Sequence, residues 1–305
     1  HAWHRVAALK ESALAQRIAA DRLDVLLDLA GFTNHHRLGT LRRHPAPVQV
    51  GWLGYFGTLG MPALDAVIAD RHCVPPDEQR FFSERLLYLP DTRLCFTAPA
   101  DAPEPAPEPP MARGGGIRLA CLQNLHKINR RVLAAWRRIL DGAPEATLLL
   151  QARQLAHPEV RRRFETLLDA SGIDRRRVDL VPPRPRPDYL AGYAEVDVLL
   201  DTFPYPGGTT TCEALWMGVP TLTLATPGML GRQGQALLQQ VDLQDWVTHS
   251  DDDYVQRAIT LARDREGTLT TLRHLRRQLR ETARRSPLFD ADTFPQHLEA
   301  LLRQA

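Results

Sequence analysis

The stretch VDVLLDTFPYPGGTTTCEALWMGVPTLTL, residues 196–224, contains the signals that decide the fold. An apolar run at 196–200 is followed by Asp201, two prolines, two glycines and three threonines, and a second apolar run follows at 221–224. Short apolar runs of this kind are typical of strands that are buried on both faces of a parallel sheet. The stretch therefore predicts a strand, a tight loop, a helix that carries residues 212–216, and a second strand.

Apolar runs and helical patterns also alternate on both sides of this stretch. Helical patterns occur at 11–22 and 129–140. The expected strands are 23–29, 48–53, 64–69 and 85–89 in the first half, and 117–122, 147–150, 178–181, 196–200 and 221–224 in the second. This spacing is that of βαβ units, which build doubly wound parallel sheets. We therefore expect an α/β protein with two Rossmann-like domains.

A change in composition divides the two halves. Residues 98–116 contain six prolines and three consecutive glycines, a composition that predicts a linker or an exposed excursion. We expect residues 1–97 to form the later part of an N-terminal Rossmann-like domain, incomplete in this chain, and residues 117–286 to form a C-terminal one.

Composition excludes several classes of partner. The chain has 305 residues, and its net charge of +2 comes from 38 basic and 36 acidic side chains, so a nucleic-acid or anionic-membrane partner is not expected. No segment approaches the roughly 18 to 20 apolar residues that span a bilayer. The four cysteines lack a CxxC pair, so neither a metal site nor a disulfide framework is predicted. We expect a cytoplasmic protein.

The loop after the strand at 196–200 is the first candidate site. Ligands of doubly wound sheets bind at the carboxyl ends of the strands. The glycines at 207–208 allow a close turn, and the threonines at 209–211 are expected to cap the helix, which predicts an anion site where a phosphate would fit. Glu213, one turn into the helix, can accept hydrogen bonds from a ribose diol. The alternative is that the threonines only cap the helix and Glu213 only favours its dipole.

A second cluster of polar residues, which includes Asn124 and Lys127, follows the strand at 117–122. Lys127 is one of two lysines, the other being Lys10, whereas the remaining 36 basic residues are arginine. A lysine at this turn suggests a requirement for a compact ammonium, such as a contact to a diphosphate. The alternative is a chance solvated lysine.

Six long segments of the chain resemble one known family, the O-GlcNAc transferase and SPINDLY-type protein glycosyltransferases of the GT-B fold. The segments are LDVLLDLAGFT, HPAPVQVGWLGYFGTLGMPALDAVIADRHCVPP and FFSERLLYLP in the first half, and NLHKINRRVLAAWRRIL, YAEVDVLLDTFPYPGGTTTCEALWMGVPTLT and GRQGQALL in the second. The resemblance implies a GT-B fold, a C-terminal domain that binds a nucleotide sugar, and a C-terminal helix within 287–305 that packs back on the first domain.

The resemblance also implies roles for individual residues. Lys127 would neutralise charge on the leaving diphosphate, Thr209 and Thr210 would donate hydrogen bonds to it, and Glu213 would hold the ribose. Further donor contacts would be Asn124, Arg186, Tyr189, Gly208, Leu53, Gly54 and Tyr55, and the expected donor cleft would include Thr33, Asn34 and His35. Among these, the ring of Tyr189 would stack on the nucleotide base.

Three positions depart from the family pattern and bear on the identity of the donor. Gly208 stands where the animal O-GlcNAc transferases have histidine, Phe56 replaces a proline, and Phe32 replaces a tyrosine, histidine or tryptophan. The form DTFPY…TTTCE resembles the SPINDLY branch, whose plant members transfer fucose from GDP-fucose. We favour UDP-GlcNAc as the donor, with GDP-fucose as the alternative.

The chemistry that the resemblance implies is an inverting transfer of the sugar to a Ser or Thr hydroxyl of a protein, with no metal and no cofactor besides the donor. No general base is assigned, because adjacent histidines such as His35 and His36 are more often exposed polar residues. The family carries upstream tetratricopeptide repeats, which we expect in the full-length protein, and we expect little activity from these 305 residues. Two alternatives are a non-catalytic nucleotide-sugar-binding protein and a GT-B enzyme with a small-molecule or lipid acceptor.

Overall fold

The computed structural model describes residues 2–305, and the chain folds into two compact units. Unit 1 consists of the N-terminal residues up to Cys95 together with Ala291–Ala305, and unit 2 consists of Phe96–Asp290. Each unit has its own parallel sheet with helices around it, which is the α/β organisation that the alternation of apolar runs predicts.

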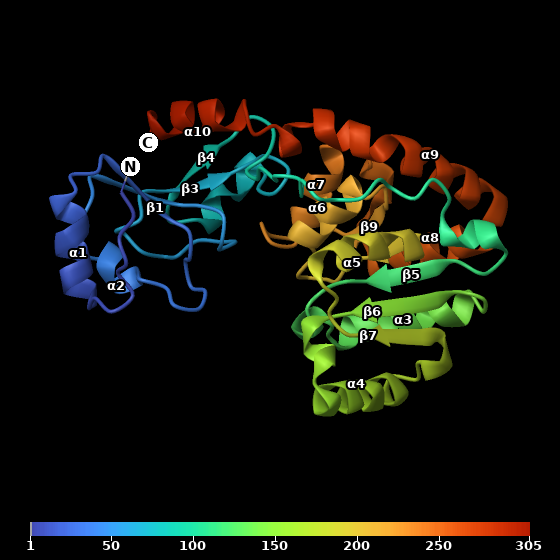
Figure 1. Cartoon of the computed structure of the whole chain (residues 1–305). Helices are drawn as coiled ribbons and strands as arrows, with labels where there is room; N and C mark the ends of the chain where they lie inside the picture. The colour runs from blue at the N-terminus through green and yellow to red at the C-terminus, as the bar shows by residue number, and fades with distance from the viewer. Residues whose placement is uncertain (1) are drawn as a thin grey trace. The chain divides into compact units, whose positions relative to one another are not determined.

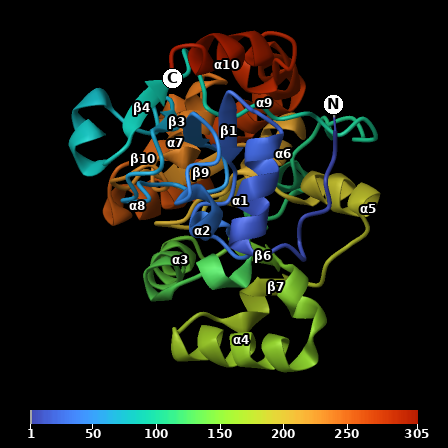
Figure 2. The ribbon, with the colours of Figure 1, turned by 90° about the vertical axis from the view of Figure 1, so that its left-hand side faces the viewer.

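Unit 1 contains a four-stranded parallel sheet in the order β1-β2-β3-β4. Its strands are β1 Val25–Asp28, β2 Val48–Gly51, β3 Ala66–Ala69 and β4 Arg85–Tyr88, and its helices are α1 Glu11–Ala20, α2 Leu38–Leu41 and α10 Phe294–Leu302. Each strand is shorter than its apolar run. The helices α1 and α2 lie side by side in Figures 1 and 2.

The C-terminal helix α10 belongs to the core of unit 1. Phe294 and Leu301 are buried in one cluster with Val50, Ile68 and Leu89. The ring of Phe294 also stacks on Trp52 at 5.9 Å between ring centroids. Burial of large apolar side chains is the main favourable term in folding, so α10 contributes to the stability of unit 1.

Unit 2 contains a six-stranded parallel sheet in the order β10-β9-β8-β5-β6-β7. Its strands are β5 Arg118–Cys121, β6 Thr147–Gln151, β7 Val178–Val181, β8 Val198–Leu200, β9 Thr221–Leu224 and β10 Val247–Thr248. Its helices are α3 Arg130–Gly142, α4 Pro158–Ala170, α5 Arg186–Ala191, α6 Thr209–Trp216, α7 Gln233–Gln239, α8 Asp251–Arg263 and α9 Arg265–Arg285. The two-residue strand β10 was not expected, because so short a strand leaves no periodic pattern. Figures 1 and 2 show α4 on the β7 side of the sheet.

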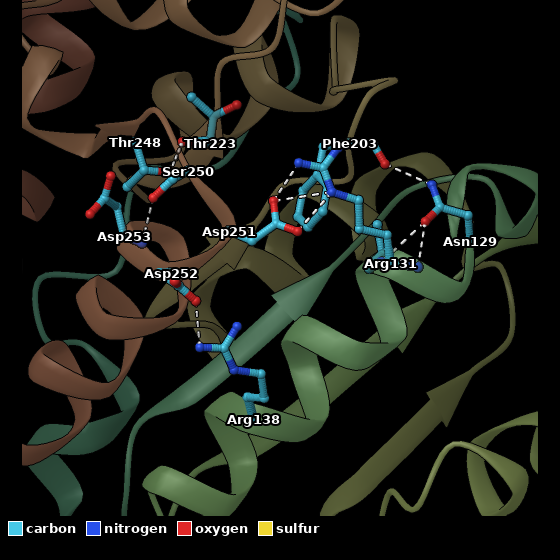
Figure 3. Close-up of polar contacts among 11 residues, drawn as sticks. Asn129, Arg131, Arg138, Phe203, Thr223, Thr248, Ser250, Asp251, Asp252 and Asp253 are labelled. Carbon is cyan, nitrogen blue, oxygen red and sulfur yellow. Dashed lines mark hydrogen bonds and ion pairs between the residues drawn. The ribbon is translucent and has the colours of Figure 1, made fainter.

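Helices α3 and α8 of unit 2 are joined by exposed ion pairs (Figure 3). Arg131 pairs with Asp251, and Arg138 pairs with Asp252 at 2.7 Å. Both helices begin with a side-chain cap, Asn129 for α3 and Ser250 for α8. Arg131 and Arg138 are seven residues apart, so they lie on one face of α3, one above the other.

The proline-rich segment at 98–116, predicted as a linker or an exposed excursion, packs on unit 2 through a few anchoring contacts. Met111 is 1% exposed, and its backbone N–H donates to the carboxylate of Asp197. Arg265 and Arg280 of α9 donate to carbonyl groups of the segment. Composition indicates only that the segment cannot fold alone, whereas here one apolar anchor and arginines from a long helix hold it in place.

Candidate functional site

The strand order of unit 2 identifies the place where a ligand is expected. Counted along the chain from β5, the order is 3-2-1-4-5-6, which is the order of dinucleotide-binding folds. The strand order reverses between β5 and β8, which pair in parallel. Ligands bind outside the carboxyl ends of the strands at this switch point. The two loops that the sequence singles out follow these two strands.

Lys127 is held at the end of the loop that follows β5. It ends a single turn of 3₁₀ helix, Leu125–Lys127, whose N-cap is Asn124. The Lys127 Nζ donates to Gln123 Oε1 at 3.1 Å and to the Pro206 carbonyl at 2.9 Å, and it lies 4.1 Å from the ring centroid of Tyr205. Burial lowers the pKa of Lys127, opposed by the charge of Asp201. The ammonium is thus fixed against the loop that follows β8.

Asn124 takes part in the same loop but points to a different partner. Its Oδ1 accepts from the backbone N–H of His126 at 3.0 Å and from the amide of Gln154 at 2.5 Å. The side chain is exposed. Asn124 therefore shapes the turn that places Lys127, and its role as a donor contact stays a prediction.

Asp201 organises the loop that follows β8. Its side chain is 1% exposed, and Oδ1 accepts from the backbone N–H of Gly207 at 2.6 Å and of Thr202 at 3.0 Å. The other oxygen accepts from the Thr223 hydroxyl at 2.9 Å. Burial raises the pKa of Asp201 to about 6. Asp201 is not among the predicted site residues, although an acid directly after an apolar run and ahead of two glycines is a usable signal.

The threonines do not cap α6, in contrast to the prediction. The N-cap is Gly208, and no side chain bonds the cap. Thr209 to Thr211 form the first helical turn, in which Thr209 is exposed, Thr210 is half-buried and Thr211 is buried. The prediction is wrong because the backbone already turns at the glycines, which places the N-cap one residue ahead of the threonines and makes Thr209 the first helical residue. The hydroxyls of Thr209 and Thr210 consequently lie at the start of α6, where anions are favoured.

The structure brings Glu213, Arg186 and Tyr189 together. Glu213 is 3% exposed; it forms an ion pair with Arg186, and its Oε2 accepts from the Tyr189 hydroxyl at 2.9 Å. The Tyr189 hydroxyl is also 3.0 Å from that of Tyr193, and the two rings meet edge to face. Burial and the charge of Glu213 raise the pKa of Tyr189. Both carboxylate oxygens of Glu213 thus have protein partners, which fixes their direction at the α5–α6 edge of the site.

The predicted residues of unit 1 form two loops, one after β2 and one after β1. Leu53 has a left-handed backbone with φ 72° and is exposed. A Cβ on Gly54 would lie 2.0 Å from the Leu29 carbonyl oxygen, so only glycine fits there. Tyr55 packs its side chain against Gly31 and meets the ring of Phe32 edge to face.

The loop after β1 presents three polar side chains. Thr33, Asn34 and His35 are all exposed. The Thr33 hydroxyl donates to the Ala30 carbonyl at 2.7 Å, and Asn34 Oδ1 accepts from the backbone N–H of His35. His35 has φ 62°. These contacts are local, so their roles at a donor cleft stay predictions.

Residues 2–305 contain no group of three His, Cys, Asp or Glu side chains placed to hold a metal ion. No helix in the same residues is long and apolar enough to cross a membrane.

Comparison with known proteins places this arrangement in a family. The model of glycosyl transferase family 41 matches residues 7–97 and 116–298. The chain belongs to glycosyl transferase family 41. The gap in the match, residues 98–115, falls within the proline-rich segment. Both candidate loops of unit 2 and both loops of unit 1 lie inside the matched ranges.

One curated relative of this family 41 chain is a protein of Solanum lycopersicum named "Probable UDP-N-acetylglucosamine--peptide N-acetylglucosaminyltransferase SPINDLY". It is 37% identical over 302 residues, which is 99% of this chain and 32% of the relative. The chain thus spans about a third of the length of that relative.

Solved structures confirm the expected fold. A mutant of the O-GlcNAc transferase of Thermobaculum terrenum matches with a TM-score of 0.90 and 37% identity, over 99% of this chain and 56% of that one. Sucrose-phosphate synthase from Thermosynechococcus elongatus matches with a TM-score of 0.60 over 96% of this chain and 76% of that one, but with 16% identity, so it supports the fold alone. The fold of this family 41 chain is GT-B.

Proposed function

We propose that the chain is the catalytic region of an inverting glycosyltransferase that moves a sugar from a nucleotide donor to Ser or Thr hydroxyls of proteins. UDP-GlcNAc is the favoured donor, because relatives that match 99% of the chain are named for UDP-N-acetylglucosamine and for a peptide acceptor. The observation that carries the proposal is the position of Lys127. Its ammonium lies at the switch point of the sheet, against the loop that leads into α6.

The diphosphate of the donor would lie between Lys127 and the first turn of α6. An ammonium and a helix N-terminus both favour negative charge, so they would stabilise the diphosphate as the bond to the sugar breaks. The acceptor hydroxyl would attack the anomeric carbon from the opposite side, which inverts its configuration. The leaving oxygen of the diphosphate would take the electron pair of the broken bond, and the proton of the acceptor hydroxyl would be released to solvent. No metal is required in this proposal, because the chain supplies the positive charge.

The nucleoside would extend toward α5. Glu213 would accept hydrogen bonds from the ribose diol. Arg186 and Tyr189 hold its buried carboxylate in one orientation for this role. Tyr189 and Arg186 would border the base. The cytoplasmic location, the upstream tetratricopeptide repeats and the roles of the unit 1 loops remain predictions.

Binding of four ligands tests the proposal. We expect UDP or UDP-GlcNAc to bind the chain more tightly than GDP or GDP-fucose in isothermal titration calorimetry. Lys127→Ala should weaken the binding of the diphosphates, whereas Lys10→Ala, which removes the one other lysine from an exposed position, should not. A chain that binds none of the four ligands contradicts the proposal, and tighter binding of GDP-fucose contradicts the donor.

Transfer is tested by the mass of acceptor proteins. Incubation of the full-length protein with UDP-GlcNAc and proteins of a host lysate should add the mass of the sugar to some of those proteins. Tight binding of the donor without transfer or hydrolysis would instead favour the non-catalytic nucleotide-sugar-binding protein. A sugar that appears on a small molecule or lipid would contradict the protein acceptor.

A further inference from the structure

One peptide group of the loop after β8 lies between two opposite charges. The peptide that joins Pro206 to Gly207 donates its N–H to Asp201 Oδ1 at 2.6 Å. Its carbonyl oxygen, which belongs to Pro206, accepts from Lys127 Nζ at 2.9 Å. The carboxylate, the peptide and the ammonium thus form a continuous hydrogen-bonded chain that links the carboxyl end of β8 to the loop after β5.

The surroundings hold this peptide in one orientation. A Cβ on Gly207 would lie 2.4 Å from Gln123 Nε2 and 2.5 Å from Thr211 Oγ1, so the peptide is packed closely on both sides. The Gly207 carbonyl accepts from the buried amide of Gln233 at 2.9 Å. Gln123 in turn accepts from Lys127. The position of the Lys127 ammonium therefore depends on the position of the peptide.

The acceptors that Lys127 contacts directly are neutral. They are the amide oxygen of Gln123, the carbonyl of Pro206 and the face of the Tyr205 ring. A partly buried ammonium loses hydration, and neutral acceptors compensate for this loss less well than a carboxylate does. Hydrogen-bonded chains polarise one another in a medium of low dielectric constant. The negative charge of Asp201 can thus act on Lys127 through the intervening peptide.

We propose that Asp201 is the positioning residue for Lys127: it orients and polarises the Pro206–Gly207 peptide, which keeps the ammonium charged and aimed at the switch point. The effect on catalysis rests on the function proposed above. The coupling of the two side chains does not, because it concerns only the fold of unit 2.

Other titratable groups lie near Asp201 and Lys127, and their charges would also influence the titration of this pair. Cys121 at the end of β5 and Tyr254 of α8 interact electrostatically with Asp201. Burial raises the pKa of Cys121 to about 12 and raises that of Tyr254 well above its usual value, so both stay neutral near pH 7. Tyr205 covers the ammonium. Asp201 is thus the buried carboxyl group next to this peptide whose charge changes around pH 6.

The two lysines of the chain make a direct test possible. Lysine labelled with ¹³C at Cε gives one signal from Lys127 and one from the exposed Lys10. We expect the Lys127 signal to shift near pH 6, when Asp201 ionises, and again when the ammonium deprotonates. Asp201→Asn keeps an acceptor for the Gly207 N–H but removes the charge. In this variant the step near pH 6 should disappear and the pKa of Lys127 should fall, while Lys10 is unchanged.

Asp197→Asn is the matched control. Asp197 precedes the same strand at its other end; its buried carboxylate also accepts two backbone N–H groups, those of Met111 and Arg118. This variant should change stability but leave the Lys127 titration unchanged. The proposal is overturned if Lys127 titrates identically in Asp201→Asn and in the unchanged chain, or if Asp197→Asn shifts Lys127 equally.

A second variant covers the case in which Asp201→Asn fails to fold. Thr223→Val removes a hydrogen bond that lowers the pKa of Asp201. The first step of the Lys127 signal should then move above pH 6. A first step that stays in place would show that Lys127 does not sense Asp201.

Activity separates this proposal from the proposed function. In Asp201→Asn we expect kcat to fall by about tenfold, which corresponds to one pKa unit of lost interaction, with little change in the donor KM. The alkaline fall of kcat should begin at a lower pH. If the chain shows the coupling by resonance but the full-length protein transfers no sugar, the proposed function is contradicted and the positioning role stays intact. Loss of kcat while Lys127 keeps its pKa overturns the positioning role.

Discussion

Asp28, the last residue of β1 in unit 1, and Asp201, which follows β8 in unit 2, each hold the loop after a strand. Asp28 is half-buried and accepts from the N–H of Gly31 at 2.7 Å, three residues away. Asp201 is buried, accepts from Gly207 six residues away, and faces Lys127 from another loop. An aspartate at the end of a strand thus supports a single turn in unit 1, whereas in unit 2 its contacts connect two loops. The two aspartates differ because Asp201 is buried, and a desolvated carboxylate requires more hydrogen-bond partners than a half-buried one.

The loops beyond these two aspartates differ accordingly. In unit 1 the side chains of Thr33, Asn34 and His35 are exposed and make local contacts. In unit 2 the polar groups around Asp201 are buried and hold one another. A group that must stabilise charge in a transition state benefits from such preorganisation. We therefore expect the largest effects on rate from the unit 2 network and smaller ones from exposed residues.

The largest expected effect is that of Lys127→Ala. If the ammonium offsets charge that grows as the bond to the sugar breaks, kcat should fall roughly 100- to 1,000-fold, or about 3 to 4 kcal/mol, and donor binding should weaken less. Lys127→Arg should not restore the rate fully, because a planar guanidinium has a different shape. Steady-state kinetics with Lys10→Ala as the control measures this. An unchanged kcat with a raised KM would show that Lys127 only binds the donor.

The second prediction concerns the pH dependence of stability and the burial of Asp201. Its pKa is raised from 3.8 to about 6, so the folded state favours the protonated form. The stability that this contributes is present below pH 3.8 and is lost as pH rises through 6. Between pH 4 and 7 the unfolding free energy of the unchanged chain should therefore fall relative to Asp201→Asn, by at most about 3 kcal/mol. Urea unfolding at several pH values measures this. The prediction is contradicted if the unfolding free energies of the two proteins change in parallel between pH 4 and 7.

A third prediction concerns how closely the backbone of unit 1 is packed in the loop after β2. Gly54→Ala places a Cβ 2.0 Å from the Leu29 carbonyl oxygen, a backbone atom that cannot move without its strand. We expect a loss of about 1 to 3 kcal/mol in unfolding free energy. Gly57→Ala is the control, because its Cβ would meet only Tyr55 at 3.9 Å. Equal melting temperatures for the two variants would mean that the β2 loop rearranges freely.

Glu213→Ala separates binding from rate within unit 2. The ribose changes little during transfer, so removal of the carboxylate should weaken nucleotide binding by about tenfold, or roughly 1.4 kcal/mol, and leave kcat nearly unchanged. Arg186 is exposed and can return to water, which limits the structural cost. Calorimetry with UDP measures the affinity. A kcat that falls as far as it does in Lys127→Ala would place Glu213 in the chemical step.

The smallest effect is expected from the exposed ion pairs of α3 and α8 (Figure 3). Arg138→Ala removes the pair with Asp252, whose side chain is 79% exposed, and should cost no more than about 1 kcal/mol of stability. Arg177→Ala is the contrasting variant, since this half-buried guanidinium donates to the carbonyls of Leu140, Ala143 and Ala146. A larger loss in melting temperature from Arg138→Ala than from Arg177→Ala would reverse the expected ranking of exposed and buried contacts.

Much of the architecture could be predicted from local patterns. The nine expected strands all occur, because a strand buried on both faces needs a continuous apolar run. Their ends and the start of α6 were less well predicted, since glycines at 207–208 let the backbone turn before the threonines are reached. The packing of residues 98–116 was missed for another reason. It depends on arginines of α9, which lie 150 or more residues away in the sequence.

The sequence by itself determined the α/β class, the family, and the choice of Lys127, Glu213 and the Gly-Gly-Thr-Thr loop as candidates. These conclusions follow from residue types and from their spacing along the chain, both of which are visible in the sequence itself. Only the tertiary structure decided that Asp201 and Lys127 lie on either side of one peptide, that Arg186 and Tyr189 orient Glu213, and that Phe294 completes the core of unit 1. Such contacts join residues that are distant in sequence, and burial, which no local pattern contains, sets the energy of the charges involved.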